Sequence, residues 1–506
     1  LGTICGDELH FVFGDRTLPA IYCRCSGASD VANRQCAAVS ACKPGCVSLP
    51  CHSLTIFFCS GEQCSTGLRF APLYRGAVSK DNDRNVSGME QKTIDLLLDC
   101  LHQDPARVSR ERLDSLSSDE WNALITLAQA QKVGGVLCHH LKSRGAEKLV
   151  PQAVWLTLQS TYWHNAVNNL NIQRELHQII TALHEGKIPV IVLKGAYLAG
   201  AVYKNPALRQ MSDIDLLVTV EDLEHVIEIL GGQGYVLQEP YLPAIELANS
   251  YCLPHLIKTD NASIDIHWNI SMPNLPYSID ASALWANAVP VYSAGTTMLG
   301  LCAEDLLLHI CMHWIYKHQL EDGMQPMCDI AETINRYSEN LNWEKLTQRA
   351  RQWQWDRGVY LAFRLAKESV GAAVPEDVLQ CLHPADFNES LLVMAQTHTY
   401  THQKITRVVS PRLAQLWHAS NPIDKALEFL RAIFLPKIVI ASMYRISPSS
   451  LLLYLYYAIR LRDVLLKYWR VALGLYQGDS TLNRTAYSKA ILGKWLADKS
   501  DGDYSS

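Results

Sequence analysis

The chain has 506 residues and a formal net charge of −5 at pH 7. This length allows roughly two to four domains with a large core. The slightly acidic balance argues against a long nucleic acid as a partner and gives no overall attraction to anionic membranes. No apolar stretch reaches the roughly 20 uninterrupted residues of a membrane helix. The nearest candidates, FLRAIFLPKIVIASMY and SSLLLYLYYAIRLRDVLL, predict buried amphipathic helices without membrane insertion, and contact with a membrane surface is the alternative.

Residues 1–88 differ from the rest of the chain. Nine of the 16 cysteines fall before residue 65, and the first methionine is Met89. A disulfide module or a zinc site would explain such crowding, but the spacings match no standard zinc pattern and an odd number cannot all pair. We expect Met89 to be the natural start and residues 1–88 to lie outside the fold, with a poorly ordered extension as the alternative. The remaining cysteine usage is typical of a reducing cytoplasm, which predicts a cytoplasmic location.

A helical segment is predicted over residues 89–185. Apolar residues recur at helical spacing from Lys92 onward. Ser117 and Glu120 form a capping-box pattern before a second helix. A long helical stretch follows Pro151, and Gly186 is expected to end it.

Residues 186–300 change to a mixed pattern. Ile188–Leu193 is a short continuous apolar run, typical of a buried strand, and a Lys-Gly turn follows it. The segments DIDLLV, GYVLQ and ASIDIHWNI predict further strands, and VEDLEHVIEILGG predicts a helix closing near Gly231. This order predicts an α+β core of roughly 110 residues.

Helical periodicity returns after the core. Residues 301–384 predict a helical domain and residues 385–476 a C-terminal helical block. Residues 477–506 are polar and predict a loose tail.

Acidic residues occupy one face of two predicted strands. Because residues two apart on a strand face the same way, Asp213 shares a face with Asp215, and Asp265 shares one with His267. If the two strands are neighbours, three carboxylates converge. Mg²⁺ (or Mn²⁺) prefers such oxygens, and two ions about 4 Å apart can hold both reacting oxygens of a phosphoryl-type transfer.

Phosphate-binding groups are predicted next to these carboxylates. Gly195 lets the backbone of the strand-to-helix turn approach a phosphate, while Lys194 and Arg209 supply positive charge. Each residue also has a simpler explanation. Lys194 could be a solvated turn lysine, and Arg209 could form a structural salt bridge. His267 could orient Asp265 or only fill space, and an Asp-x-Asp pair by itself is common in surface loops.

A second group of candidate ligands is histidine-rich. His309 and His313 lie four residues apart on one predicted helical face, with His318 and Asp329 further along, a spacing that could bind a transition metal. The glutamate of a His-Glu-x-x-His metalloprotease motif is absent between them. Core histidines or a wall of a nucleotide pocket are the simpler interpretation.

Three motifs resemble those of the nucleotidyltransferase superfamily that includes DNA polymerase β. They are LKG beginning at Leu193, DIDLLV beginning at Asp213 and DIHW beginning at Asp265. The motifs resemble more closely a little-characterised bacterial branch of this superfamily, from about Leu96 to at least Gly371. The resemblance implies a small mixed-sheet nucleotidyltransferase core flanked by helical domains on both sides. It also implies that Asp213, Asp215 and Asp265 hold the metals, and that Asp265 helps to deprotonate an acceptor hydroxyl.

The resemblance implies transfer of a nucleoside monophosphate from an NTP, with release of pyrophosphate. The acceptor is open between a small molecule, a sugar or antibiotic, a protein side chain and an RNA end. The sequence departs from the superfamily pattern in two ways. The turn glycine, Gly195, is followed by Ala196, where the superfamily has a phosphate-contacting serine, and the gap from Gly195 to Asp213 is long. The alternative is a catalytically silent scaffold that binds nucleotide or a protein partner. A metal-dependent hydrolase centred on His309 and His313 lacks a supporting general base.

Overall fold

The computed structural model describes residues 80–401 apart from 242, 274–278 and 294, parts of 409–497, and five strands before residue 60. Two compact units are present, Leu1–Val78 and Ser79–Ser506. In the first unit, three strands form an antiparallel sheet and two more form a hairpin: β1 (Gly2–Cys5), β2 (Glu8–Phe13), β3 (Arg16–Pro19), β4 (Val47–Cys51) and β5 (Leu54–Phe58). The prediction that 1–88 lies outside the fold falls largely outside the described residues.

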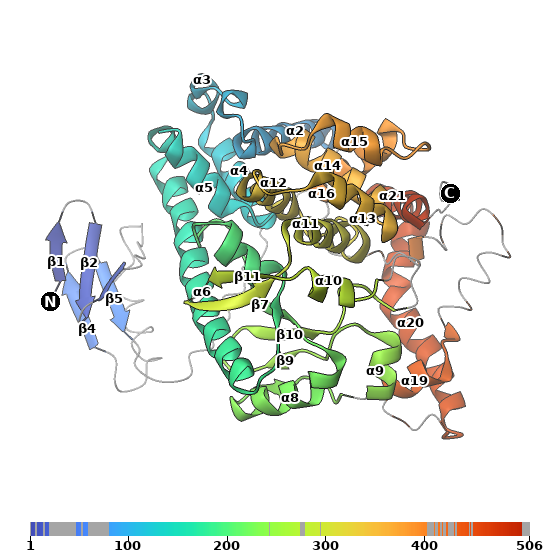
Figure 1. Cartoon of the computed structure of the whole chain (residues 1–506). Coiled ribbons are helices and arrows are strands. Elements are labelled where there is room, and N and C mark those ends of the chain that lie inside the picture. Colours follow the sequence, from blue (N-terminus) through green and yellow to red (C-terminus); the bar gives the residue numbers. More distant parts are fainter. Residues whose placement is uncertain are drawn as a thin grey trace. The chain divides into compact units, whose positions relative to one another are not determined.

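A seven-stranded mixed sheet forms the centre of the second unit, in the order β11-β12-β6-β7-β10-β9-β8 (Figure 1). β7 pairs with β10 and β12 with β6 in parallel, and the other neighbours are antiparallel. The strands are β6 (Ile191–Val192), β7 (Asp213–Leu217), β8 (Val236–Leu237), β9 (Leu256–Ile257), β10 (Ser263–His267), β11 (Val289–Ser293) and β12 (Thr296–Gly300). The α+β prediction is confirmed. The β11–β12 hairpin, which local pattern did not indicate, extends the sheet beyond β6.

Helices precede the sheet, as the periodicity predicts. They are α2 (Lys80–Leu101), α3 (Arg110–Asp114), α4 (Ser118–Ala130), α5 (Gly134–Ser143) and α6 (Gln152–Glu185). The capping box at the start of α4 is confirmed, because Ser117 and Glu120 exchange both hydrogen bonds. Gly186 follows the last residue of α6, which runs beside the sheet in Figure 1. Between and after the first strands lie α7 (Lys194–Tyr197), a π-helical turn (Leu198–Val202), α8 (Leu223–Gly232), α9 (Pro243–Asn249) and α10 (Ser282–Ala286).

Helices also follow the sheet and share its core. They are α11 (Ala303–Met312), a π-helical turn (His313–Lys317), α12 (Gln325–Tyr337), α13 (Trp343–Gln352), α14 (Asp356–Val370), α15 (Glu376–Leu382), α16 (Glu389–Thr401), α19 (Lys437–Met443) and α20 (Leu453–Tyr476). One cluster of buried apolar side chains extends from Ile94 to Trp495 and includes Ile214 and Ile264 beneath the sheet. The flanking helices therefore complete the core of the sheet.

The prediction of a loose tail over residues 477–506 is wrong for most of the segment. Ser480–Ala497 forms helix α21, because its apolar residues Leu492 and Trp495 enter the main core. Lys489 is buried there and pairs with Glu321. The polar composition hid an amphipathic helix that packs by one face.

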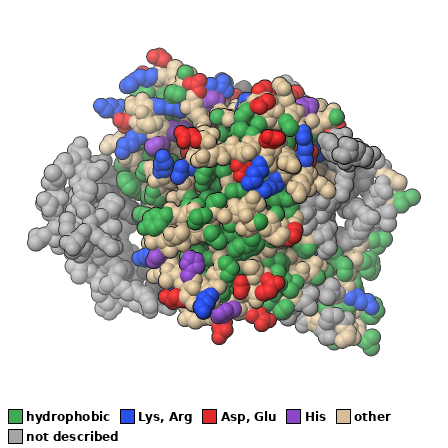
Figure 2. Space-filling model, in the orientation of Figure 1, with side chains coloured by type: hydrophobic (Ala, Val, Ile, Leu, Met, Phe, Trp, Pro, Cys, Tyr) green, Lys and Arg blue, Asp and Glu red, His purple; other side chains and the backbone are tan. Residues whose placement is uncertain are grey.

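None of the described helices is long and apolar enough to cross a membrane. α20 nevertheless differs from the buried helix predicted for its sequence. It packs against α19 and α21 and exposes several large apolar side chains, including Leu455, Leu466 and Trp469. Hydrophobic side chains are visible on the surface in this region, at the lower right of Figure 2.

Gly300, at the end of β12, allows a close aromatic contact. A Cβ at this position would lie 2.0 Å from Cε2 of Tyr197, a buried ring whose hydroxyl is 2.9 Å from that of Tyr337. We expect Gly300→Ala to lower the free energy of unfolding by about 1–3 kcal/mol through overpacking, as measured by urea denaturation. Gly231→Ala is the matched control, since a Cβ there meets nothing within 4 Å. Equal stability of the two variants would contradict this prediction.

Candidate active site

Two parallel neighbouring strands bring two of the three predicted carboxylates together, and Asp213 is not part of this close group. β7 and β10 pair in a register that sets Asp265 directly beside Asp215. Ile214, Leu216, Ile264 and Ile266 take the opposite face and are fully buried, as expected from the alternation of side chains along a strand. The donor atoms of Asp215, Asp265 and His267 lie within 4.8 Å of one another.

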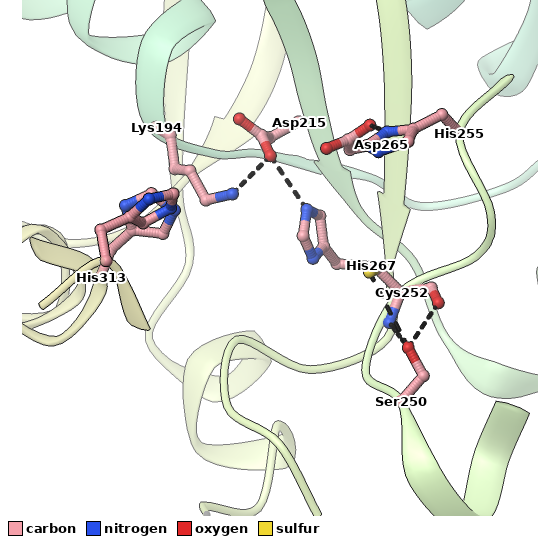
Figure 3. A network of polar contacts seen from close by, with 9 residues as sticks. Lys194, Asp215, Ser250, Cys252, His255, Asp265, His267 and His313 are labelled. Atoms are coloured by element: carbon pink, nitrogen blue, oxygen red, sulfur yellow. Dashed lines mark hydrogen bonds and ion pairs between the residues drawn. The ribbon is translucent and has the colours of Figure 1, made fainter. Parts of the chain in front are cut away.

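Asp215 is almost fully buried and has two partners. Lys194 Nζ lies 2.5 Å from Asp215 Oδ1, and His267 Nε2 lies 2.9 Å from the same oxygen (Figure 3). Burial alone would raise the pKa of Asp215, but the Lys194 ammonium and the His267 hydrogen bond outweigh burial and hold the pKa well below its usual value. Asp215 is therefore ionised at neutral pH.

Asp213 is in a different state. It is half-buried at the start of β7, and its side chain makes no hydrogen bond or ion pair among the described residues. Burial, and then the charge of Asp215, raise the pKa of Asp213 above its ordinary value. A cation placed between these carboxylates would remove that repulsion.

Asp265 and His267 have partners other than those considered from sequence. His267 bonds to Asp215, and it is His255 whose Nδ1 makes a short contact with Asp265 Oδ1 (Figure 3). Sequence reasoning missed His255. Leu256 pairs with Ile264 in the antiparallel β9–β10 ladder. His255, just before Leu256, therefore lies opposite Asp265, just after Ile264. Burial, and then the Lys194 charge, lower the pKa of His267, so its ring is neutral and donates from Nε2 to Asp215.

The Lys-Gly turn lies against this carboxylate cluster. Leu193 N donates to Asp215 O over 2.9 Å, which fixes the end of β6 beside β7. Lys194 then takes a left-handed conformation with φ 40°, and α7 begins. A Cβ on Gly195 would lie 3.0 Å from Nη1 of Arg209, so glycine lets the turn approach the guanidinium.

Arg209 makes the salt bridge that was one of its two sequence interpretations. Its Nε and Nη2 bind the two carboxylate oxygens of Asp329 on α12 at 2.9 and 3.0 Å. Tyr203 donates its hydroxyl to Asp329 Oδ1. Nη1 is the guanidinium nitrogen nearest Gly195 and bonds weakly to Gln210 O at 3.4 Å.

The long connection from Gly195 to Asp213 is held by asparagines on α6. Asn169 Nδ2 donates to the carbonyls of Pro206 and Arg209, and Asn168 Nδ2 donates to that of Met211. Asn165 binds the carbonyl of Ala207 in the same way. The motif HNAVNNLN is rich in asparagine, a poor helix former, and this was the feature of the sequence that could have indicated these contacts.

A cavity of about 400 Å³ joins these groups. Its acidic side contains Asp213, Asp215 and Asp265, and the Lys-Gly turn and Arg209 form an adjoining wall. α11 and the segment after it add three histidines and a lysine to the lining. These are His309, His313, Lys317 and His318, and the lining also includes Lys132 and Asp322. All of the predicted site residues except the buried His267 line this cavity.

A mixed sheet with carboxylates on two parallel strands beside a Lys-Gly turn is consistent with the core of a nucleotidyltransferase. Residues 117–371 match a protein family described as "Uncharacterised nucleotidyltransferase", and the chain belongs to that family. Comparisons with curated proteins and with solved structures gave no match. The resemblance inferred from sequence is confirmed at the level of the family.

Proposed function

We propose that this protein transfers a nucleoside monophosphate from an NTP to an acceptor hydroxyl, with release of pyrophosphate. The observation that carries the proposal is the parallel register of Asp215 and Asp265 at the floor of a cavity large enough for a nucleotide. Family membership supports the same class of reaction.

The carboxylates fit a divalent cation. Asp213 has no partner among the described residues and its pKa is raised by burial and by Asp215, so bound positive charge would stabilise its ionised form. We assign Asp213, Asp215 and Asp265 as the residues that would hold Mg²⁺ or Mn²⁺. Such an ion would neutralise the carboxylates and polarise the phosphoryl group.

Lys194 has a double role in this proposal. Without a cation it neutralises Asp215, as the 2.5 Å contact shows. With positive charge at the carboxylates, the ammonium would be repelled and could turn into the cavity, where a triphosphate offers acceptor oxygens. Gly195 keeps the backbone close to that position. Arg209 would act mainly by holding the loop before β7 through its pair with Asp329, while its Nη1 points toward Gly195.

Asp265 is the proposed general base. Its register position puts it at the cavity, and its oxygen contacts His255, a side chain that is 58% exposed. A proton taken from the acceptor hydroxyl by Asp265 could therefore pass to His255 and then to water. His267 would orient Asp215 through its Nε2 hydrogen bond.

One observation favours the catalytically silent scaffold. Lys194 and His267 already satisfy Asp215 Oδ1, so the fold tolerates this buried carboxylate without a metal. The test is incubation of the purified full chain with each labelled NTP, Mg²⁺ or Mn²⁺, and a cell extract as the source of acceptor. Labelled product that is absent with Asp265→Asn supports transfer. Nucleotide binding without product under any of these conditions favours the scaffold.

Lys194→Ala tests the phosphate role of this lysine. We expect binding of Mg²⁺–NTP to weaken by about 1.5–3 kcal/mol, the usual size of a charge-assisted hydrogen bond, as measured by calorimetry. Lys204→Ala, on an exposed lysine of the same connection, is the control. Unchanged affinity in Lys194→Ala would leave the lysine with a structural role only.

The same variant has an expected pH dependence. Lys194 helps to hold the pKa of Asp215 below its unfolded value, so this contribution to stability is present above the usual aspartate pKa and is lost as the pH falls through the folded pKa. The stability difference between parent and Lys194→Ala should therefore narrow in acid. Thermal melting of both proteins between neutral pH and the acid limit of folding would show this.

A further inference from the structure

The segment after α11 contains a second group of metal-ligating side chains that the proposed transfer does not use. α11 continues into a π-helical turn at His313–Lys317, and His318 N donates to His313 O over 2.9 Å. Residues five apart project about 140° apart around an α-helix. The wider π turn brings them into line, and such turns are frequent at functional sites.

The two histidine rings consequently lie together. Their centroids are 4.2 Å apart, and His313 Nε2 is 3.1 Å from His318 Nε2. Two imidazole nitrogens on one tetrahedral zinc ion are separated by about 3.3 Å, given metal–nitrogen distances of about 2.0–2.1 Å. The observed separation therefore needs only a small adjustment to accept an ion, although a hydrogen bond between the rings also accounts for it.

The chain then reverses and adds a carboxylate. Gln319 and Leu320 both have positive φ, 51° and 68°, an uncommon conformation for residues other than glycine. Asp322 Oδ2 comes to 3.8 Å from His313 Nδ1, and Asp322 Oδ1 to 3.6 Å from His318 Nδ1. One donor atom from each of the three residues lies within 4.8 Å of the others. Buried Lys489 of α21 pairs with Glu321 and fixes this loop.

His309 adds an unused nitrogen near this group. It lies one turn before His313 in α11 and is fully buried, and its Nδ1 has no hydrogen-bond partner among the described residues. Figure 3 shows His313 beside the Lys194 side chain, so this group faces the same cavity as the carboxylates.

We propose that His313, His318 and Asp322 bind a divalent first-row transition-metal ion of the zinc type, at a site separate from the Asp213–Asp215–Asp265 cluster. Two imidazoles and one carboxylate suit such an ion, whereas Mg²⁺ prefers an all-oxygen shell. Three protein ligands leave a coordination position open to the cavity, where water or a substrate oxygen could bind. This site does not depend on the proposed transfer reaction.

Titration of the full chain with Co²⁺ alone, after removal of metals with a chelator, tests the proposal. Co²⁺ in a low-coordinate imidazole site absorbs visible light strongly, whereas Co²⁺ on carboxylates and water absorbs weakly. We expect a strong band that saturates at one equivalent and is displaced by Zn²⁺ but not by Mg²⁺. His318→Gln and Asp322→Asn should each weaken binding by more than about tenfold, because even groups around metal ligands have effects of that size. Circular dichroism would establish that both variants are folded.

Two matched variants locate the ion. Asp213→Asn should retain the band, and so should His225→Gln, a change at an exposed histidine of α8. A band that survives in folded His318→Gln and disappears in Asp213→Asn would place the ion at the carboxylates and overturn the proposal. Absence of a strong band in the parent would also overturn the proposal. If inorganic phosphate then raised the melting temperature of the parent but not of His318→Gln, the cluster would be an anion site. Stabilisation by Mg²⁺–NTP is scored separately, so failure here is distinguishable from failure of the transfer proposal.

Discussion

Asp213→Asn and Asp215→Asn are both expected to abolish nucleotide transfer, yet to change the stability of the metal-free protein in opposite directions. Each substitution removes a carboxylate that we assign to the cation site. Activity should fall by more than about 100-fold, since changes merely around a metal ligand already reach that size. Mg²⁺–NTP should raise the melting temperature of the parent and not of either variant, because only a native state that binds ligand gains stability by mass action.

The stability changes follow from the partners of the two side chains. Asp213 has a raised pKa and no partner among the described residues, so its ionised form destabilises the fold as pH rises through the folded pKa. Asp213→Asn should therefore raise the melting temperature at neutral pH, by roughly 1–3 °C. Asp215→Asn instead leaves Lys194 without its counter-charge and should lower the free energy of unfolding by about 1–3 kcal/mol.

Thermal melting with and without Mg²⁺–NTP measures both effects. Asp114→Asn, on an exposed residue of α3, serves as the control for loss of one negative charge. If the parent shows no shift with any of the four NTPs, and Mn²⁺ does not rescue it, the catalytic proposal fails and the scaffold becomes the better account. Equal stability changes in the two variants would contradict the distinct roles assigned to Asp213 and Asp215.

Arg209→Ala is expected to lower the free energy of unfolding by about 3–5 kcal/mol, the range for breaking a buried ion pair. Arg209 and Asp329 are 11% and 4% exposed and form two hydrogen bonds, so removal of the arginine leaves a buried carboxylate without its counter-charge. The sequence left both a phosphate contact and a structural salt bridge open for Arg209. The two-point pair with Asp329 is the reason that a large loss of stability is expected.

A double-mutant cycle separates the two roles of Arg209. Asp329→Ala should also be strongly destabilising, and the double variant should lose much less than the sum, because the two changes remove one interaction. Arg209→Lys should rescue only part of the loss, since an ammonium cannot form the two-point contact. Arg174→Ala, on an exposed residue of α6, is the control in urea denaturation. Normal stability of Arg209→Ala together with weakened NTP binding would assign this side chain to phosphate alone.

Local periodicity determined the elements that carry the site. The alternation in DIDLLV and in SIDIHW fixed which side chains share a face, because successive residues of a strand must point to opposite sides. The Ser117–Glu120 cap and Gly186 after α6 were likewise readable, since caps depend on residues within one helical turn. The family motifs added the likeness to nucleotidyltransferases.

Only the tertiary structure decided the partners of each charged group. Lys194 to Asp215, His255 to Asp265 and Arg209 to Asp329 are contacts between elements that come together through sheet register and helix packing. The β11–β12 hairpin and the packing of α21 were equally beyond the sequence pattern, because a polar surface face or a short strand has little local signal. Periodicity specifies which face of an element is buried. It does not specify which distant element covers that face. The packing of distant elements is what brings Lys194 and His267 to Asp215 and leaves the Asp213 side chain without a partner among the described residues.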